Sequence, residues 1–209
     1  MYSFSRITTP KVRVGVALLV SFITVLVAYY GSTRTTSANM FAEMSHSISD
    51  AFGITFLFIS LLATNKLWGW IRKASVLTLF VAGGIALWKA YDTTGYLVSQ
   101  ESAKILDHHT LLYTSVTIVV LVVMQLQLLG PMHTMFHEHT NADHHHAHDA
   151  AKTELIADLG QALFGVALAL SALYVLQDSP WWLRLCDILF TFLAGMWMVK
   201  RGLAMIFAK

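Results

Sequence analysis

Two pairs of ionisable residues, each spaced four apart, lie where the chain is otherwise apolar. His46 and Asp50 form the first pair, and Glu154 and Asp158 form the second pair much later in the chain. Residues four apart share one face of a helix, so each pair can converge on a single point. Two facing pairs would therefore offer one imidazole and three carboxylates to one divalent cation, which we take as the predicted metal site.

The chemistry of this ligand set narrows the choice of metal. Zn²⁺ favours four nitrogen and oxygen ligands, which two facing pairs can supply. One nitrogen with three carboxylates is a harder set than that of most structural zinc sites, so Co²⁺, Cd²⁺, Fe²⁺ and Mn²⁺ stay open beside Zn²⁺. The single cysteine, Cys186, excludes a site built from several thiolates.

The same residues suggest what the site does. Ionisable groups inside a membrane span are rare and usually mark an ion or proton pathway. They must be deprotonated to hold a metal, so metal binding releases protons. We therefore expect metal/proton antiport by alternating access, which is the work of a secondary transporter rather than an enzyme. A hydrogen bond between helices is the structural alternative for one such residue, but it would not require four of them.

Two further groups of residues can be interpreted either as functional or as structural. Glu43, one turn before His46, is either an additional carboxylate beside the metal path or a residue that caps or solvates the start of its helix. Asp107, His108 and His109 are either a metal exit site or the polar start of a helix. Adjacent helical residues point about 100° apart, which favours the helix start.

The segment from Pro131 to Lys152 differs in composition from the rest of the chain. Seven of the ten histidines lie in it, and they are His133, His137, His139, His144, His145, His146 and His148. Histidine is the commonest protein metal ligand, so we expect a flexible cytoplasmic loop that captures metal in an auxiliary role. The plainer alternative is a hydrophilic linker between two helices.

The composition is that of an integral membrane protein. Hydrophobic residues make up 56% of the 209 residues and charged residues only 12%. The net charge of +2 gives no reason to expect a nucleic-acid partner, so the expected partners are divalent metal ions, protons and the lipid bilayer. We predict an all-α fold, a single domain over residues 1–209 without a carboxy-terminal soluble domain. Its six predicted transmembrane helices are Val14–Tyr30, Ala38–Ala63, Ala74–Tyr91, Leu111–Leu129, Leu155–Leu176 and Trp182–Val199.

The distribution of basic residues predicts the orientation. If the amino terminus is cytoplasmic, ten of the 14 Lys and Arg residues fall on the cytoplasmic side and four on the outside. This asymmetry fits the positive-inside rule, with both termini in the cytoplasm. The first helix lacks a small-residue cleavage site and is read as an uncleaved span. The expected location is a bacterial inner membrane, in which the chain is multi-pass.

Several stretches resemble the cation diffusion facilitator family, a group of zinc transporters with six transmembrane helices. Residues 37–50, Ser-Ala-Asn-Met-Phe-Ala-Glu-Met-Ser-His-Ser-Ile-Ser-Asp, are similar to its second-helix signature, and residues 153–158, Thr-Glu-Leu-Ile-Ala-Asp, to its fifth-helix signature. Residues 68–72 and 182–201, the latter with Asp187, resemble its third and sixth helices. The resemblance implies proton-driven efflux of Zn²⁺ or a similar cation from the cytoplasm, through a site formed by His46, Asp50, Glu154 and Asp158.

The chain departs from the family pattern in two respects. Most zinc-transporting members carry His or Asp where this chain has Glu154, and the longer carboxylate leaves the preferred metal open. We also expect the chain to lack the family's carboxy-terminal cytoplasmic domain, which binds metal and dimerises. A homodimer would then form through the membrane helices, where the small-residue stretch from Val81 to Ala86 permits close approach.

Two other functions compete with transport. A membrane metal sensor or chaperone would use the His-rich loop and keep the helices as an anchor. A di-iron membrane enzyme would use the same histidines as His boxes. The enzyme is less favoured, because a rigid di-iron site draws its ligands from several ordered helices and these histidines lie in one short segment.

Overall fold

The computed structural model describes residues 9–35, 37–62, 68–99, 107–129, 142–174 and 181–207. Within these ranges, the side chains at 10, 60–62, 68–73, 75, 96–99, 142–154, 157, 205 and 207 lie outside the description. The described residues form helices and no strand, which confirms the all-α class. The helices are α1 (Pro10–Arg34), α2 (Ala38–Leu62), α3 (Trp68–Ser99), α4 (His108–Leu129), α6 (Ala142–Tyr174) and α7 (Trp181–Phe207).

All six predicted spans coincide with these helices. Three segments of the described chain are long and apolar enough to cross a membrane, and they are Lys11–Arg34, His108–Leu129 and Trp181–Ala204. In α6 the apolar segment is shorter, Asp158–Tyr174. Helix α2 carries buried polar residues, among them Glu43, His46 and Asp50. That α2, α3 and α6 also cross the membrane is part of the proposed function.

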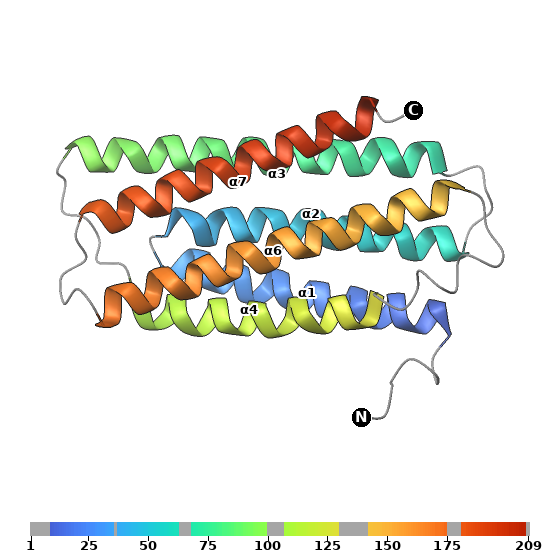
Figure 1. Cartoon of the computed structure of the whole chain (residues 1–209), viewed down its shortest axis with the longest axis horizontal. Coiled ribbons are helices and arrows are strands. Elements are labelled where there is room, and N and C mark those ends of the chain that lie inside the picture. Colours follow the sequence, from blue (N-terminus) through green and yellow to red (C-terminus); the bar gives the residue numbers. More distant parts are fainter. Residues whose placement is uncertain are drawn as a thin grey trace.

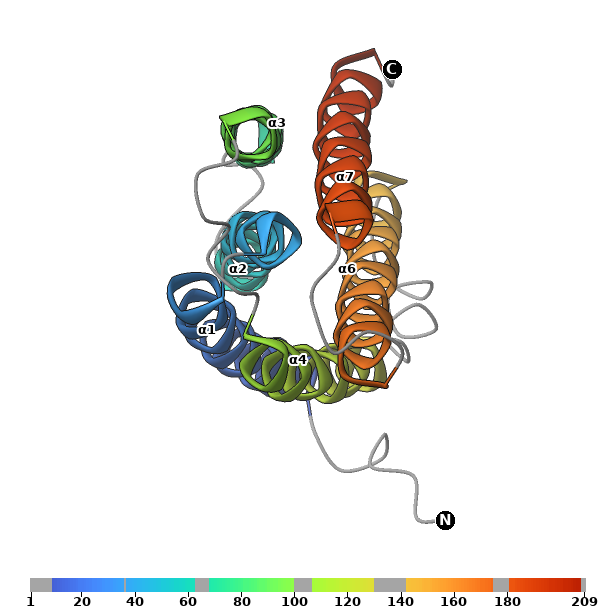
Figure 2. The same cartoon turned by 90° about the vertical axis from the view of Figure 1, so that its left-hand side faces the viewer.

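The helices run lengthwise in one bundle with α2 near its centre. Figure 1 shows α6 crossing in front of α2, and Figure 2 shows α3 and α7 on the side opposite α4. Helix α2 packs against α1, α3, α6 and α7, whereas α4 packs against α1 and α6. Pro10 at the start of α1 and Phe207 at the end of α7 lie at the same end of the bundle (Figure 1). A residue on α2 can therefore meet residues from most of the other helices.

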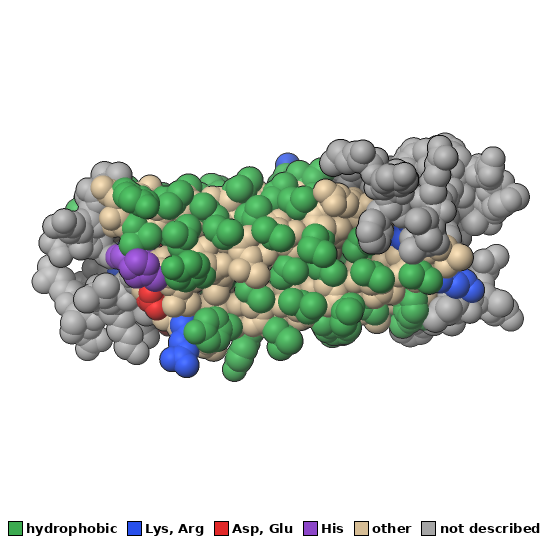
Figure 3. Space-filling view, turned by 90° about the horizontal axis from the view of Figure 1, so that it is seen from below, with side chains coloured by type: hydrophobic (Ala, Val, Ile, Leu, Met, Phe, Trp, Pro, Cys, Tyr) green, Lys and Arg blue, Asp and Glu red, His purple; other side chains and the backbone are tan. Residues whose placement is uncertain are grey.

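The outer surface carries large apolar side chains. Leu19 and Leu26 on α1 are 61% and 66% exposed, and Leu193 on α7 is 62% exposed. Figure 3 shows one long face on which hydrophobic side chains cover the middle, while the histidine and acidic side chains in view gather near one end. Apolar surface of this extent is expected against lipid rather than water. It supports membrane insertion of the bundle.

Helices α3 and α7 approach closely at two glycines. A Cβ atom added at Gly195 would lie 2.9 Å from Leu87 Cγ and 3.1 Å from the Gly83 carbonyl oxygen. A Cβ atom at Gly83 would in turn lie 3.0 Å from the Gly195 carbonyl oxygen. The neighbouring Gly84 is exposed and has open space around its Cα. Part of the small-residue stretch predicted for a dimer contact thus serves packing within the chain.

The start of α2 is fixed by a carboxylate on α7. The Ser37 hydroxyl and the Asn39 N–H donate to Asp187 Oδ1 at 2.7 and 3.0 Å, and the Ala38 N–H donates to Asp187 Oδ2 at 2.6 Å. The Ser37 hydroxyl oxygen also accepts from the Met40 N–H at 3.2 Å. The first N–H groups of a helix lack partners within it and favour a negative charge. Asp187 therefore anchors the helix that carries His46 and Asp50.

The start of α6 differs from the prediction. The segment 131–152 was expected to be a flexible loop, but α6 begins at Ala142, so the backbone of its second half is helical. The amino-acid composition of the segment explains why its second half is helical. After Pro131 this segment has no further proline and no glycine, and positions 142, 147, 150 and 151 are alanine, the strongest helix former.

Candidate metal centre

Three of the four predicted ligands meet in the centre of the bundle. His46 and Asp50 come from α2 and Asp158 comes from α6, and one ligand atom from each lies within 4.8 Å of the others. All three side chains are buried, at 2%, 5% and 2% exposure. This triad confirms that a two-residue motif on one helix faces a carboxylate on the other.

Contacts between α2 and α6 bring the triad together. The Asn39 side-chain amide donates to the Gln161 carbonyl oxygen at 3.5 Å, and the Gln161 side-chain amide donates to the Asn39 carbonyl oxygen at 3.4 Å. Gly165, one turn further along α6, allows α6 to approach α4 closely, because an added Cβ would lie 2.5 Å from Ser115 Oγ. The contacts between Asn39 and Gln161 fix the position of α6 along α2, so that Asp158 lies beside His46.

His46 lies between the two carboxylates. Its Nδ1 is 2.6 Å from Asp158 Oδ1, and its Nε2 is 3.7 Å from Asp50 Oδ1. Both ring nitrogens therefore lie near carboxylate oxygens, and a cation placed between these groups would offset the negative charge of the carboxylates. Removing two carboxylates from water costs free energy unless a positive charge compensates them. The triad is chemically suited to exchange a proton for a divalent cation.

Glu43 is a third buried acid, beside the two acids of the triad. Its side chain is 1% exposed, and neither of its carboxylate oxygens has a hydrogen-bond partner among the described residues. Glu43 lies one turn before His46 on α2. The sequence left open a solvating or capping role for Glu43. Its burial excludes solvation, and the capping role belongs to Ser37 and Asp187.

The remaining predicted ligands lie wholly or partly outside the described residues. Glu154 is in α6, one turn before Asp158, but its side chain is not described. His133, His137 and His139 are outside the described chain. The backbone at 144, 145, 146 and 148 is helical, and the side chains of those histidines are likewise outside the description. Their part in metal binding stays a prediction.

Asp107 begins helix α4. It accepts hydrogen bonds from the Thr110 hydroxyl at 2.6 Å and from the Thr110 N–H at 3.1 Å. These two bonds, the hydroxyl foremost, hold the pKa of the Asp107 carboxyl below its ordinary value. His109 is exposed and points to no described ligand cluster. The trio at 107–109 is thus accounted for as a capped helix start, the second of the two interpretations drawn from the sequence.

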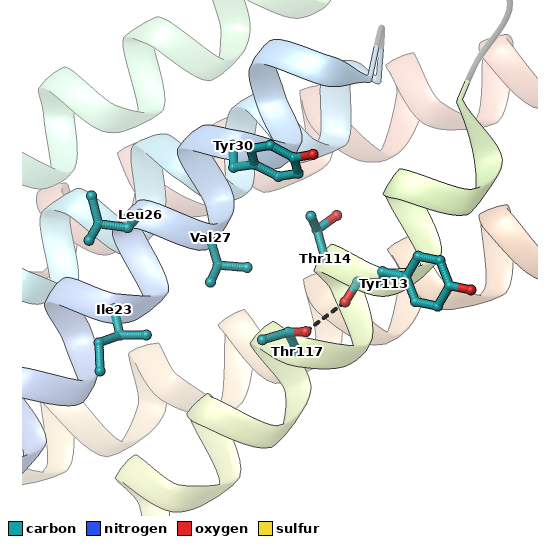
Figure 4. Close-up of a pocket in the computed structure, with 7 residues that line it drawn as sticks. All are labelled: Ile23, Leu26, Val27, Tyr30, Tyr113, Thr114 and Thr117. Atoms are coloured by element: carbon teal, nitrogen blue, oxygen red, sulfur yellow. Dashed lines mark hydrogen bonds between the residues drawn. The ribbon is translucent and has the colours of Figure 1, made fainter.

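A shallow groove between α1 and α4 is separate from the triad. It has a volume of about 380 Å³ and is lined by Ile23, Leu26, Val27, Tyr30, Tyr113, Thr114 and Thr117 (Figure 4). The Thr114 and Thr117 hydroxyls donate to backbone oxygens of α4 at 2.7 Å. No His, Cys, Asp or Glu lines the groove, so it is not a second metal site.

Asp187 is the functional residue whose role sequence reasoning missed. The resemblance placed it in the last helix without a partner, and 149 residues separate it from Ala38, which it caps. The available signal was Ser37, a favoured cap residue at the start of the predicted second span. No protein-family model matches this chain, and a comparison with curated proteins finds no match either.

Proposed function

We propose that this protein moves a divalent transition-metal cation, with Zn²⁺ the expected ion, across a membrane in exchange for protons. In this proposal all six helices cross the membrane and both termini are cytoplasmic, as in the cation diffusion facilitator family that the chain resembles. Transport follows alternating access, in which the central site opens to one side at a time. Co²⁺, Cd²⁺, Fe²⁺ and Mn²⁺ are further candidate substrates.

One observation supports this function above all others. Two acids and a histidine from different helices are buried together in a bundle whose outer surface is apolar. Groups of this kind are retained inside a membrane protein where an ion or proton passes. Asp158 and Gln161 follow one another along the face of α6 that meets α2, which places the triad in the interior rather than at a surface.

The geometry around His46 suggests how protons and metal exchange. His46 Nδ1 lies 2.6 Å from Asp158 Oδ1 and Nε2 lies 3.7 Å from Asp50 Oδ1, so a proton carried by the imidazole would lie beside both carboxylates. A metal ion that binds the same ring nitrogen and the same carboxylate oxygens must displace that proton. Proton and metal therefore compete for the same atoms, and this competition is the coupling that antiport requires. Glu154 completes the proposed ligand set from the cytoplasmic side of α6.

Metal-driven proton flux in proteoliposomes tests the proposal. Zn²⁺, Co²⁺, Cd²⁺, Mn²⁺ and Fe²⁺ are compared in the wild-type chain and in Asp50→Ala. Metal and proton should move in opposite directions, and Asp50→Ala should lower the flux by at least about tenfold. Asp92→Ala is the matched control, because Asp92 is a half-buried acid on α3 that pairs with Lys89 at 3.0 Å, away from the triad.

The same assay separates transport from a sensor or chaperone. Deleting residues 131–152 should leave most of the flux if the triad carries the ion. If the deletion abolishes metal-dependent function while Asp50→Ala does little, the His-rich segment is the functional part and the transport proposal is wrong.

A further inference from the structure

We propose that Glu43 forms a second position for the transported divalent cation, about 4.5 Å along α2 from the triad toward the helix's amino-terminal end. The inference rests on the proposed function, because it names a further station for the same ion. With the amino terminus of the chain in the cytoplasm, this end of α2 faces outward. The ion would pass from the triad to Glu43 on its way out.

Glu43 is deeply buried, and its carboxylate has no partner among the described residues. The side chain is 1% exposed, as deeply buried as the triad itself, and both carboxylate oxygens have no hydrogen-bond partner among the described residues. None of the ion pairs found in the described chain includes Glu43. A buried carboxylate without a donor or a cation is among the costliest groups a protein can hold. Its retention there indicates a partner that binds in the working cycle.

Glu43 also lies next to the triad along α2. Glu43 lies three residues before His46, and the two side chains share one face of α2. Asp158 on α6 lies 2.6 Å from His46, so a cation that leaves the triad toward the start of α2 would come between Asp158 and Glu43. A cation between them can keep Asp158 as a ligand while it leaves Asp50. One shared carboxylate thus links the two positions.

A second acceptor lies one turn further along the same face. The Asn39 side chain is 1% exposed, and its amide nitrogen donates to the Gln161 carbonyl oxygen at 3.5 Å. Its amide oxygen has no hydrogen-bond partner among the described residues. Carboxylate and amide oxygens are ligands that hard divalent cations accept. The order Asp50, His46, Glu43, Asn39 therefore forms a row of acceptors that leads from the triad toward the start of α2.

A cysteine at position 43 offers a direct test with Cd²⁺ as the probe. In a Cys186→Ser background, Glu43→Cys provides the chain's only thiol, since Cys186 is its one cysteine. The full-length protein is reconstituted in lipid vesicles and titrated with Cd²⁺. If the ion visits position 43, a cadmium–thiolate charge-transfer band appears in the ultraviolet. Asp92→Cys in the same background should show no such band on the same Cd²⁺ titration.

Glu43→Gln provides the second readout. This change keeps the shape of the side chain and removes its charge. Zn²⁺ flux should fall about ten- to a hundredfold, while equilibrium Zn²⁺ binding that depends on Asp50 stays within about threefold of the wild type. Retained Asp50-dependent binding also demonstrates that the variant is folded.

The outcomes distinguish this inference from the proposed function. Wild-type flux in Glu43→Gln, or no thiolate band in Glu43→Cys that still binds metal through the triad, would overturn the second position and leave the transport proposal intact. If the wild-type chain shows no Asp50-dependent flux, the transport proposal fails. The thiolate band then still decides whether a cation binds at position 43.

Discussion

His46 is the only nitrogen ligand in the triad and lies between two acids, so its replacement should change which metal is preferred. In His46→Asp the triad becomes three carboxylates, a harder ligand set that suits Mn²⁺ better than Zn²⁺. We expect the ratio of Zn²⁺ flux to Mn²⁺ flux in proteoliposomes to fall by about tenfold. Both ions are measured at equal concentration in the same vesicles.

His109→Asp serves as the control for this change, because His109 is exposed at the start of α4 and belongs to no described ligand cluster. Its flux ratio should equal that of the wild type. An unchanged ratio in His46→Asp would mean that the imidazole does not contact the transported ion.

Asp107 offers a residue whose contribution depends on pH. Hydrogen bonds from Thr110 lower its folded pKa, so its contribution to stability is complete above the unfolded pKa. The contribution is lost as the pH falls through the lowered folded value. At about pH 7, Asp107→Ala should weaken protection of the first-turn amides of α4 by about fivefold, which corresponds to a cap worth about 1 kcal/mol. Amide hydrogen exchange read by mass spectrometry measures this.

Asp107→Asn separates the cap from its charge. Asn keeps an oxygen that can accept from Thr110 but does not titrate, so its protection should not change with pH, whereas that of the wild type should fall toward it as the carboxylate is protonated. If the wild type and Asp107→Asn show the same protection at every pH, the charge of the Asp107 carboxylate does not contribute to the cap.

At the scale of the helices, the α3–α7 contact depends on two glycines. In Gly195→Ala the new methyl group would meet the Gly83 carbonyl oxygen at 3.1 Å as well as Leu87, and backbone cannot yield as a side chain can. We expect a loss of about 1–3 kcal/mol in the free energy of unfolding, measured by denaturant titration in detergent micelles.

Gly84→Ala is the matched control for the helix contact. It lies beside Gly83 on α3, and nothing is within 4 Å of its added Cβ. Alanine has the higher helix propensity, so this variant should be unchanged or more stable by up to about 1 kcal/mol. Equal destabilisation of both variants would show that α3 tolerates no methyl group there for reasons other than its contact with α7.

The helices were more predictable than the contacts between them. Long apolar stretches and flanking polar residues place a helix wherever a span was predicted, because local hydrophobicity decides helix formation in a membrane. The His46–Asp50 spacing and Asp158 predicted three members of the site, since i, i+4 spacing follows from helix geometry alone. The role of Asp187 at Ser37 and the burial of Glu43 could not be predicted. Both depend on how helices distant in sequence are placed beside each other.

At the scale of the whole molecule, an even number of crossings places both ends on one side. In a Cys186→Ser background, single cysteines at Thr9 and Ile206 should react alike with a membrane-impermeant maleimide in sealed vesicles of one orientation. His109→Cys, at the opposite end of the bundle, should react from the other side. Labelling of Thr9→Cys and Ile206→Cys from opposite sides would exclude six crossings. A homodimer through the membrane helices remains a prediction, for which the exposed Gly84 face of α3 is still free within the chain.

The cap on α2 also determines the order in which the protein matures. Ala38 and Asp187 are separated by 149 residues, so at roughly 5–20 residues per second the ribosome adds Asp187 roughly 7–30 s after Ala38, the first residue of α2. During that interval the nascent chain already holds His46 and Asp50, but the start of their helix has no anchor. Asp158 is synthesised before α7, which carries Asp187. A chain released before its final helix would therefore contain every predicted ligand and still lack a formed site.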